Sequence, residues 1–218
     1  LIREVPILQR CYNSQAQELV DWKIKFRQQT PKDLFAMFEN LVDFASEWHT
    51  TSPADRLDRA SLPSDVGFDK LDDDPGLYVL GVVGVGIKST VLYHLDARSF
   101  PRRDRNAMYG LLFLSGKSDF GMPSRTSEFI MAVDKKFGGW AASERNIRME
   151  HNFWYPYGVF TLHAMVVWRR LRELAARLGV TLDESHRFVA VAAFLQGVRD
   201  LHVEDVRTML GHDEMGIP

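Results

Sequence analysis

Cysteine is almost absent from this sequence, which has one such residue, Cys11, among 218. One cysteine cannot form an internal disulfide, a cysteine-rich zinc site or a four-cysteine iron–sulfur cluster within one chain. A chain of this length can bury roughly 70% of the surface that its unfolded form exposes, so its core needs no such cross-link. The sequence therefore predicts a reducing, cytoplasmic location and a site without a metal or another cofactor.

Long apolar runs and an excess of one charge are also missing. No segment approaches the roughly 20 apolar residues of a membrane-spanning helix, and the first ten residues lack the layout of a signal peptide. We therefore expect no membrane partner. Lys and Arg number 27 against 29 Asp and Glu, which gives a formal net charge of -2. This balance excludes a uniformly basic nucleic-acid binder, but it is compatible with a local basic patch.

Apolar residues with helical spacing are present over most of the sequence. Thr30 and Pro31 are typical of a helix start, and apolar residues follow them at three- and four-residue intervals up to Trp48. One short run, residues 77–83, has the composition of a strand. We therefore predict an all-α fold, with a single helical domain over residues 1–218.

The C-terminal part of the sequence predicts the longest helix, with Gly179 at its end. The apolar residues expected to face inward on this helix are Phe160, Ala164, Val167, Leu171, Leu174 and Leu178. Residues 181–184 form a capping-box pattern that predicts the start of another helix, and a short helix is expected near 203–210.

Residues 74–92 contain the most informative pattern in the sequence. Asp74 and Pro75 predict the start of a short helix that runs toward a Gly-Val-Gly triplet at 84–86. Glycine permits a sharp reversal of the chain, and a second helix is predicted from Ile87 onward. The arrangement is a helix-hairpin-helix, whose backbone N–H groups could hold a DNA phosphate without reading a base.

This hairpin resembles that of the helix-hairpin-helix DNA glycosylase superfamily, especially its 8-oxoguanine DNA glycosylase branch. The family has a hairpin of the form L-P-G-V-G-x-K, which residues 84–88 (GVGIK) match. A helix, a loop and an aspartate that opens the next helix follow in the family, and residues 100–104 (FPRRD) match that loop. The match lies within a region of about 74–115 and implies a nucleophile at Lys88 and a catalytic carboxylate at Asp104.

The resemblance implies a DNA N-glycosylase that flips out and excises a modified or damaged purine such as 8-oxoguanine, with or without an abasic-site lyase step. Asp104 would stabilise the positive charge that develops on the sugar in the transition state. An uncharged Lys88 would attack C1′ and form a Schiff base. Lys88 lies in the first turn of its predicted helix, where the helix dipole and partial burial both favour the uncharged amine.

DNA is the expected partner, and residues 84–107 carry a local net charge of +3. The residues predicted to contact DNA are Gly84, Val85, Gly86, Arg102, Arg103 and Arg105. The candidate base pocket is the aromatic run Phe153, Trp154, Tyr155 and Tyr157. Aromatic residues more often serve packing in a protein core, which favours that role for this run.

Other interpretations stay open on the sequence alone. One is a non-catalytic DNA-binding or protein-interaction module that keeps the hairpin, and another is a glycosylase-like protein that processes nucleobases in bacterial antiviral defence. Residues 81–90 also have some likeness to a phosphate-binding P-loop. That pattern requires glycine directly before the lysine, whereas Ile87 stands there, so we regard a nucleotide triphosphatase as the weakest alternative.

Overall fold

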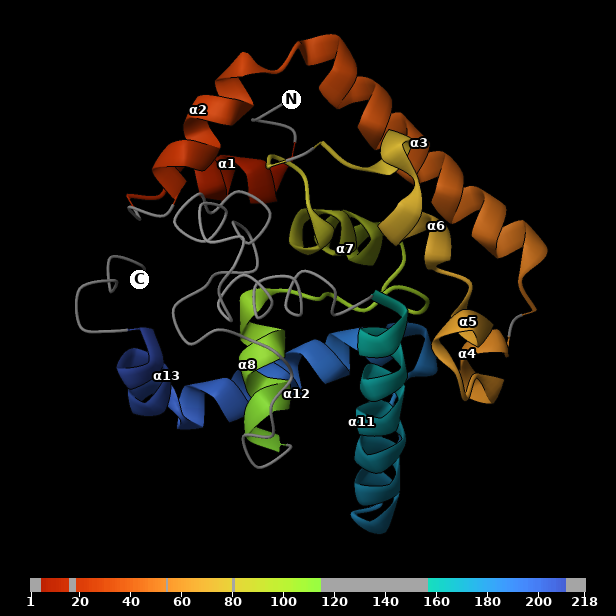
Figure 1. The fold of residues 1–218 in the computed structure, drawn as a ribbon. Coiled ribbons are helices and arrows are strands. Elements are labelled where there is room, and N and C mark those ends of the chain that lie inside the picture. Colours follow the sequence, from red (N-terminus) through yellow and green to blue (C-terminus); the bar gives the residue numbers. More distant parts are fainter. Residues whose placement is uncertain (1–4, 16–18, 54, 80, 115–156, 211–218) are drawn as a thin grey trace, which may run out of the picture.

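The computed structural model of the protein describes residues 5–15, 19–53, 55–79, 81–114 and 157–210, and these form helices joined by turns and loops (Figure 1). In chain order the elements are α1 (Pro6–Asn13), α2 (Val20–Gln28), α3 (Pro31–Thr51), α4 (Arg56–Arg59), α5 (Pro63–Val66), α6 (Asp69–Asp73), the 3-10 turn η2 (Pro75–Leu77), α7 (Val85–Leu95), α8 (Arg105–Leu114), α11 (Tyr157–Arg177), the 3-10 turn η3 (Glu184–His186), α12 (Arg187–Leu201) and α13 (Val203–Leu210). Within the described residues, the all-α prediction is confirmed.

The predicted start of α3 is also confirmed. Thr30 Oγ1 accepts a hydrogen bond from the backbone N–H of Asp33 at 3.1 Å, and Pro31 occupies the first helical position. The cap satisfies one of the N–H groups that have no acceptor within the helix. The apolar stripe that follows is buried at Leu34 and Leu41, so α3 lies along one side of the core (Figure 1).

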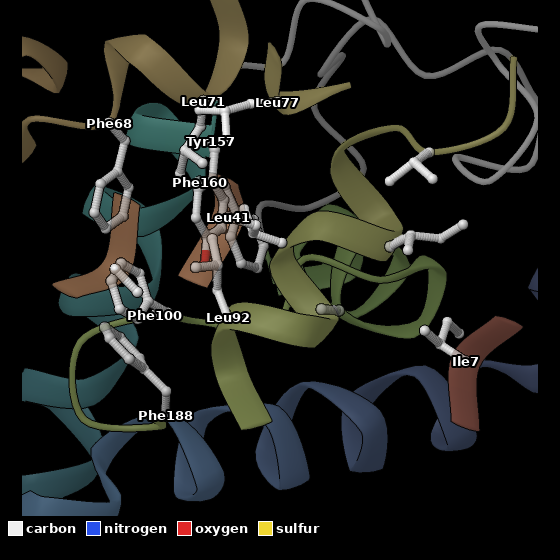
Figure 2. Packing of buried hydrophobic residues seen from close by; sticks show 14 of the residues in the cluster. Ile7, Leu41, Phe68, Leu71, Leu77, Leu92, Phe100, Tyr157, Phe160 and Phe188 are labelled. Atoms are coloured by element: carbon white, nitrogen blue, oxygen red, sulfur yellow. The ribbon is translucent and has the colours of Figure 1, made fainter. Parts of the chain in front are cut away.

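An aromatic stack at the centre of the core holds the loop between α7 and α8. The ring of Phe68 lies 5.4 Å from that of Phe100 and 5.0 Å from that of Tyr157, measured between centroids. All three side chains are almost completely buried, and Figure 2 shows them together with Phe188. Because Phe100 belongs to the loop that leads to Asp104, burial of this ring fixes the start of the loop to the core.

Helices α8 and α12 cross with their backbones in close contact (Figure 1). At the crossing, a Cβ atom added to Gly110 would lie 2.2 Å from the carbonyl oxygen of Leu195. Real Cβ atoms do not approach a backbone oxygen this closely, so the position requires glycine. Ala107 and Leu111, which flank Gly110 in the sequence of α8, are also buried.

The sequence pattern is misleading at the end of α11. Phe160, Ala164 and Val167 are buried as predicted. The prediction that Leu174 and Leu178 face the core is wrong, because these side chains are 53% and 80% exposed. Figure 1 shows that α11 extends beyond the helices that pack on its first half, so the apolar spacing continues where neighbouring elements no longer cover it.

Burial of His163 on α11 lowers its pKa below the ordinary value of 6.5. Below pH 6.5 the unfolded chain therefore binds more protons than the folded protein. We expect the free energy of unfolding to fall as the pH drops from 6.5 toward the lower pKa of the folded state. Urea titrations at pH 7.5 and 5.5 measure this loss, which should be smaller in His163→Gln and unchanged in a His94→Gln control at an exposed position.

The chain before α7 reverses in a different place from the one predicted. The short helix predicted before the Gly-Val-Gly triplet is wrong, because the 3-10 turn η2 is followed by a tight turn in which Val79 and Val83 pair as an isolated bridge. Gly81 has a φ of +76° in this turn, which a residue with a side chain rarely adopts. Trp22 of α2 anchors the turn by donating its indole N–H to the carbonyl of Val82 at 2.8 Å. The reversal thus occurs at Gly81, and the Gly-Val-Gly triplet begins α7 instead.

Candidate functional site

The N-terminus of α7 is the first component of the candidate site. Gly84 precedes the helix in an extended conformation, and Val85 and Gly86 are its first two residues. A Cβ atom added to Gly84 would meet no other atom within 4 Å, so there is free space beside this residue. The first N–H groups of a helix lack intrahelical acceptors and attract anions such as phosphate.

Lys88 lies in the first turn of α7, and its backbone N–H donates to the carbonyl of Gly84 at 3.0 Å. Its side chain is directed into the protein, where the exposed fraction is 4% and Nζ donates a hydrogen bond to the carbonyl oxygen of Leu71. A reaction of this amine with a sugar carbon requires that the hydrogen bond to Leu71 be broken and that the side chain turn outward.

Asp104 lies directly before α8 and caps this helix, so the structure gives it a clear local role. Its Oδ1 accepts a hydrogen bond from the backbone N–H of Ala107 at 2.9 Å, and its Oδ2 lies 2.7 Å from Nε of Arg102. The side chain of Asp104 is 14% exposed. A carboxylate held on both oxygens has a fixed orientation, as an electrostatic catalyst requires.

The loop that carries Asp104 is attached to the rest of the protein at several points. The hydroxyl of Tyr157 donates to the carbonyl of Pro101 at 2.6 Å, and the backbone N–H of Arg103 donates to Ser89 Oγ at 3.1 Å. Ser89 follows Lys88 and Arg103 precedes Asp104. The fold therefore brings the backbones of the two predicted catalytic residues together, while their side chains contact different partners.

Two of the three predicted arginines have their guanidinium groups over aromatic rings. Cζ of Arg102 lies 5.6 Å from the ring centroid of Tyr93, and Cζ of Arg105 lies 6.0 Å from that of Tyr109. Burial raises the pKa of Tyr93; the charge of Arg102 opposes this rise, and that of Asp104 adds to it. Tyr93 is therefore neutral at physiological pH and presents a flat surface to Arg102.

Arg103 differs from Arg102 and Arg105 because it is buried, with an exposed fraction of only 1%. An arginine that the sequence pattern did not identify contacts the start of α8. Arg199 of α12 donates from Nε and Nη2 to Oδ1 of Asn106, at 3.1 and 2.8 Å. The two residues are 93 positions apart, and no local motif on α12 marks this arginine. A cationic group thus lies beside the N-terminus of α8.

The predicted base pocket can be placed only in part. Phe153, Trp154 and Tyr155 lie outside the described residues. Tyr157 is 1% exposed and belongs to the aromatic stack of the core, where it supports the loop at Pro101. Its position in the described structure is that of a packing residue.

The described part of the chain contains no cluster of three or more His, Cys, Asp or Glu side chains suited to hold a metal ion. None of the described helices is long and apolar enough to cross a membrane. Comparisons with models of protein families, with curated proteins and with solved structures found no match. Function is therefore inferred from the site: the N-terminus of α7, a loop that is hydrogen-bonded to Ser89 of this helix and bears the oriented carboxylate of Asp104, and Arg102 paired with that carboxylate.

Proposed function

We propose that the protein is a DNA N-glycosylase that flips out and excises a modified or damaged purine such as 8-oxoguanine. The observation that carries the proposal is the contact between Ser89 and Arg103, which joins the first turn of α7 to the loop bearing Asp104. A phosphate-binding element and a carboxylate next to each other are what base excision needs, since the enzyme must hold the backbone while it acts on one sugar.

Asp104 acts on the sugar in this proposal. Breaking the N-glycosidic bond moves positive charge onto the sugar ring, and an oriented carboxylate stabilises that charge. Backbone N–H groups at the start of α7 hold a phosphate of the flipped strand, and Arg102 and Arg105 bind further phosphates. The ion pair between Nε of Arg102 and Asp104 keeps the carboxylate in one orientation.

Lys88 determines whether a lyase step follows base removal. When its amine attacks C1′, a bond from Nζ to C1′ forms as the bond to the base breaks, and the base leaves with a proton. Loss of a proton from Nζ and opening of the sugar then give a Schiff base, which allows elimination of the 3′ phosphate. Without Lys88, water takes the place of the amine and the product is an intact abasic site.

Borohydride trapping on DNA that contains 8-oxoguanine separates these two routes. If Lys88 is the nucleophile, wild-type protein becomes covalently attached to DNA and Lys88→Gln does not. If water is the nucleophile, the free base is released without trapping, and Lys88→Gln retains most of that activity. Trapping of Lys88→Gln to the wild-type extent would show that another amine is the nucleophile.

A second candidate function is a DNA-binding module without catalysis, and the burial of Lys88 favours it. A lysine that is 4% exposed and bonded to the carbonyl of Leu71 has a structural role in the free protein. Such a module would bind DNA in a salt-sensitive manner through the start of α7 and release no base after long incubation.

Both candidate functions predict that DNA affinity depends on the arginines of the loop. Arg102→Gln or Arg105→Gln should weaken binding on every DNA sequence and lower the slope of log Kd against log salt by about 0.9 for each phosphate that is no longer neutralised. Fluorescence anisotropy at several salt concentrations measures this slope. The control is Arg170→Gln on α11, where the arginine is 74% exposed and pairs with Glu173. An equal effect of the control would contradict a local DNA-binding surface.

A further inference from the structure

Ser89 joins two segments of the candidate site that are separate in the sequence. Its side chain is completely buried, and Oγ accepts a hydrogen bond from the backbone N–H of Arg103 at 3.1 Å. The carbonyl oxygens of Arg103 and of Gly86 both lie 3.2 Å from Oγ and are the acceptors for its one hydrogen. A single hydroxyl group thus contacts both the first turn of α7 and the loop before Asp104.

We propose that Ser89 is a positioning residue, which sets the distance between the N-terminus of α7 and the carboxylate of Asp104. This inference rests on the proposed glycosylase function. Where phosphate and sugar of the same nucleotide must be held at once, the spacing of the groups that hold them determines the rate. A displacement of about 1 Å is enough to lower a rate about 100-fold.

The anchors of the loop explain why this hydroxyl can be removed without loss of the fold. Phe100 is buried in the aromatic stack, and Pro101 accepts a hydrogen bond from Tyr157. These contacts hold the loop to the core from the side of α11. The register of the loop against α7 depends on Ser89, so Ser89→Ala should move Asp104 relative to the helix end while the core stays packed.

Thr90 provides a matched control on the same helix. It is the next residue, it is also buried, and its Oγ1 donates to the carbonyl of Gly86 at 2.8 Å. This hydrogen bond stays within α7 and does not reach the loop. Thr90→Val therefore removes a buried hydroxyl group from nearly the same surroundings but keeps the link between helix and loop.

Single-turnover base release under saturating protein, together with the KM of multiple turnovers, tests the proposal. Ser89→Ala should lower kcat about 10- to 100-fold with little change in KM, whereas Thr90→Val should stay close to wild type. Ser89→Cys is a second variant that changes only the γ atom of the side chain, and it should also lose kcat because a thiol is a weak acceptor. Equal losses in the Ser89 and Thr90 variants would overturn the positioning role.

Hydrogen exchange of the Arg103 amide gives a readout that does not need catalysis. This amide donates to Ser89 Oγ, so its protection should fall in Ser89→Ala and persist in Thr90→Val. Unchanged protection in Ser89→Ala would contradict the inference even if the protein is active. If wild-type protein releases no base from any altered DNA, the proposed function fails, and the positioning role fails with it.

Discussion

Asp104→Asn is expected to lower the rate of base release at least about 100-fold, because an amide cannot stabilise the positive charge that develops on the sugar. Asparagine is as good a helix N-cap as aspartate, so it can still accept the hydrogen bond from the backbone N–H of Ala107. The fold of α8 should therefore survive, and the change should affect chemistry more than stability.

Asp96 offers a matched control for this substitution at the other end of the same loop. Its Oδ1 accepts a hydrogen bond from the backbone N–H of Arg98 at 2.8 Å, and its Oδ2 pairs with His49 at 3.3 Å. Asp96→Asn changes one partly exposed contact with His49 and should change base release less than about threefold. Single-turnover assays compare the two variants, and retention of the wild-type rate by Asp104→Asn would remove Asp104 from the mechanism.

Gly110→Ala is expected to destabilise the protein by about 3 kcal/mol, although alanine normally favours a helix over glycine by about 1 kcal/mol. The new Cβ atom would lie 2.2 Å from the carbonyl oxygen and 2.8 Å from the carbonyl carbon of Leu195. These are backbone atoms of α12, so no rotation of a side chain can relieve the overlap. The helices must separate, which also disturbs the contact between Asn106 and Arg199.

Gly197 on α12 is the control for this prediction. An added Cβ atom there meets nothing within 4 Å, so Gly197→Ala should stabilise the protein by about 0.5 to 1 kcal/mol. Equilibrium unfolding in urea measures both changes. A stabilising effect of Gly110→Ala would show that α8 and α12 do not pack as closely as described.

Some local sequence signals predicted helix ends correctly, whereas the capping-box pattern at 181–184 leads into the 3-10 turn η3 and α12 begins only at Arg187. Thr30 and Pro31 mark the beginning of α3 because cap and proline act within one turn of the chain. Gly179 follows α11 with a φ of +71°, as expected for a glycine at the end of a helix. The short helix near 203–210 was likewise predicted with the observed bounds. Each of these features depends on neighbours in the sequence.

Features that depend on tertiary contacts were not predictable. The reversal at Gly81 is held by the bridge between Val79 and Val83 and by the contact of Val82 with Trp22, a residue 60 positions away. The exposure of Leu178 reflects where the neighbours of α11 end, which the spacing of apolar residues cannot indicate.

The same distinction applies to the candidate site. The pattern around residues 84–88 and 100–104 identified the two segments, and the contact between Ser89 and Arg103 joins them. The direction of the Lys88 side chain could not be read from the sequence, because it depends on the carbonyl of Leu71 in α6. Arg199 was missed for a similar reason, since its partner Asn106 lies on another helix.

Release of a free base from DNA distinguishes the proposed glycosylase from a module that only binds DNA. Wild-type protein is incubated with duplexes that contain 8-oxoguanine or other altered purines, and the released base is separated by chromatography and quantified. We expect release of at least one altered purine, and loss of that release in Asp104→Asn. Salt-sensitive binding to every duplex without release of any base would contradict the proposed glycosylase function and would leave a DNA-binding module as the function.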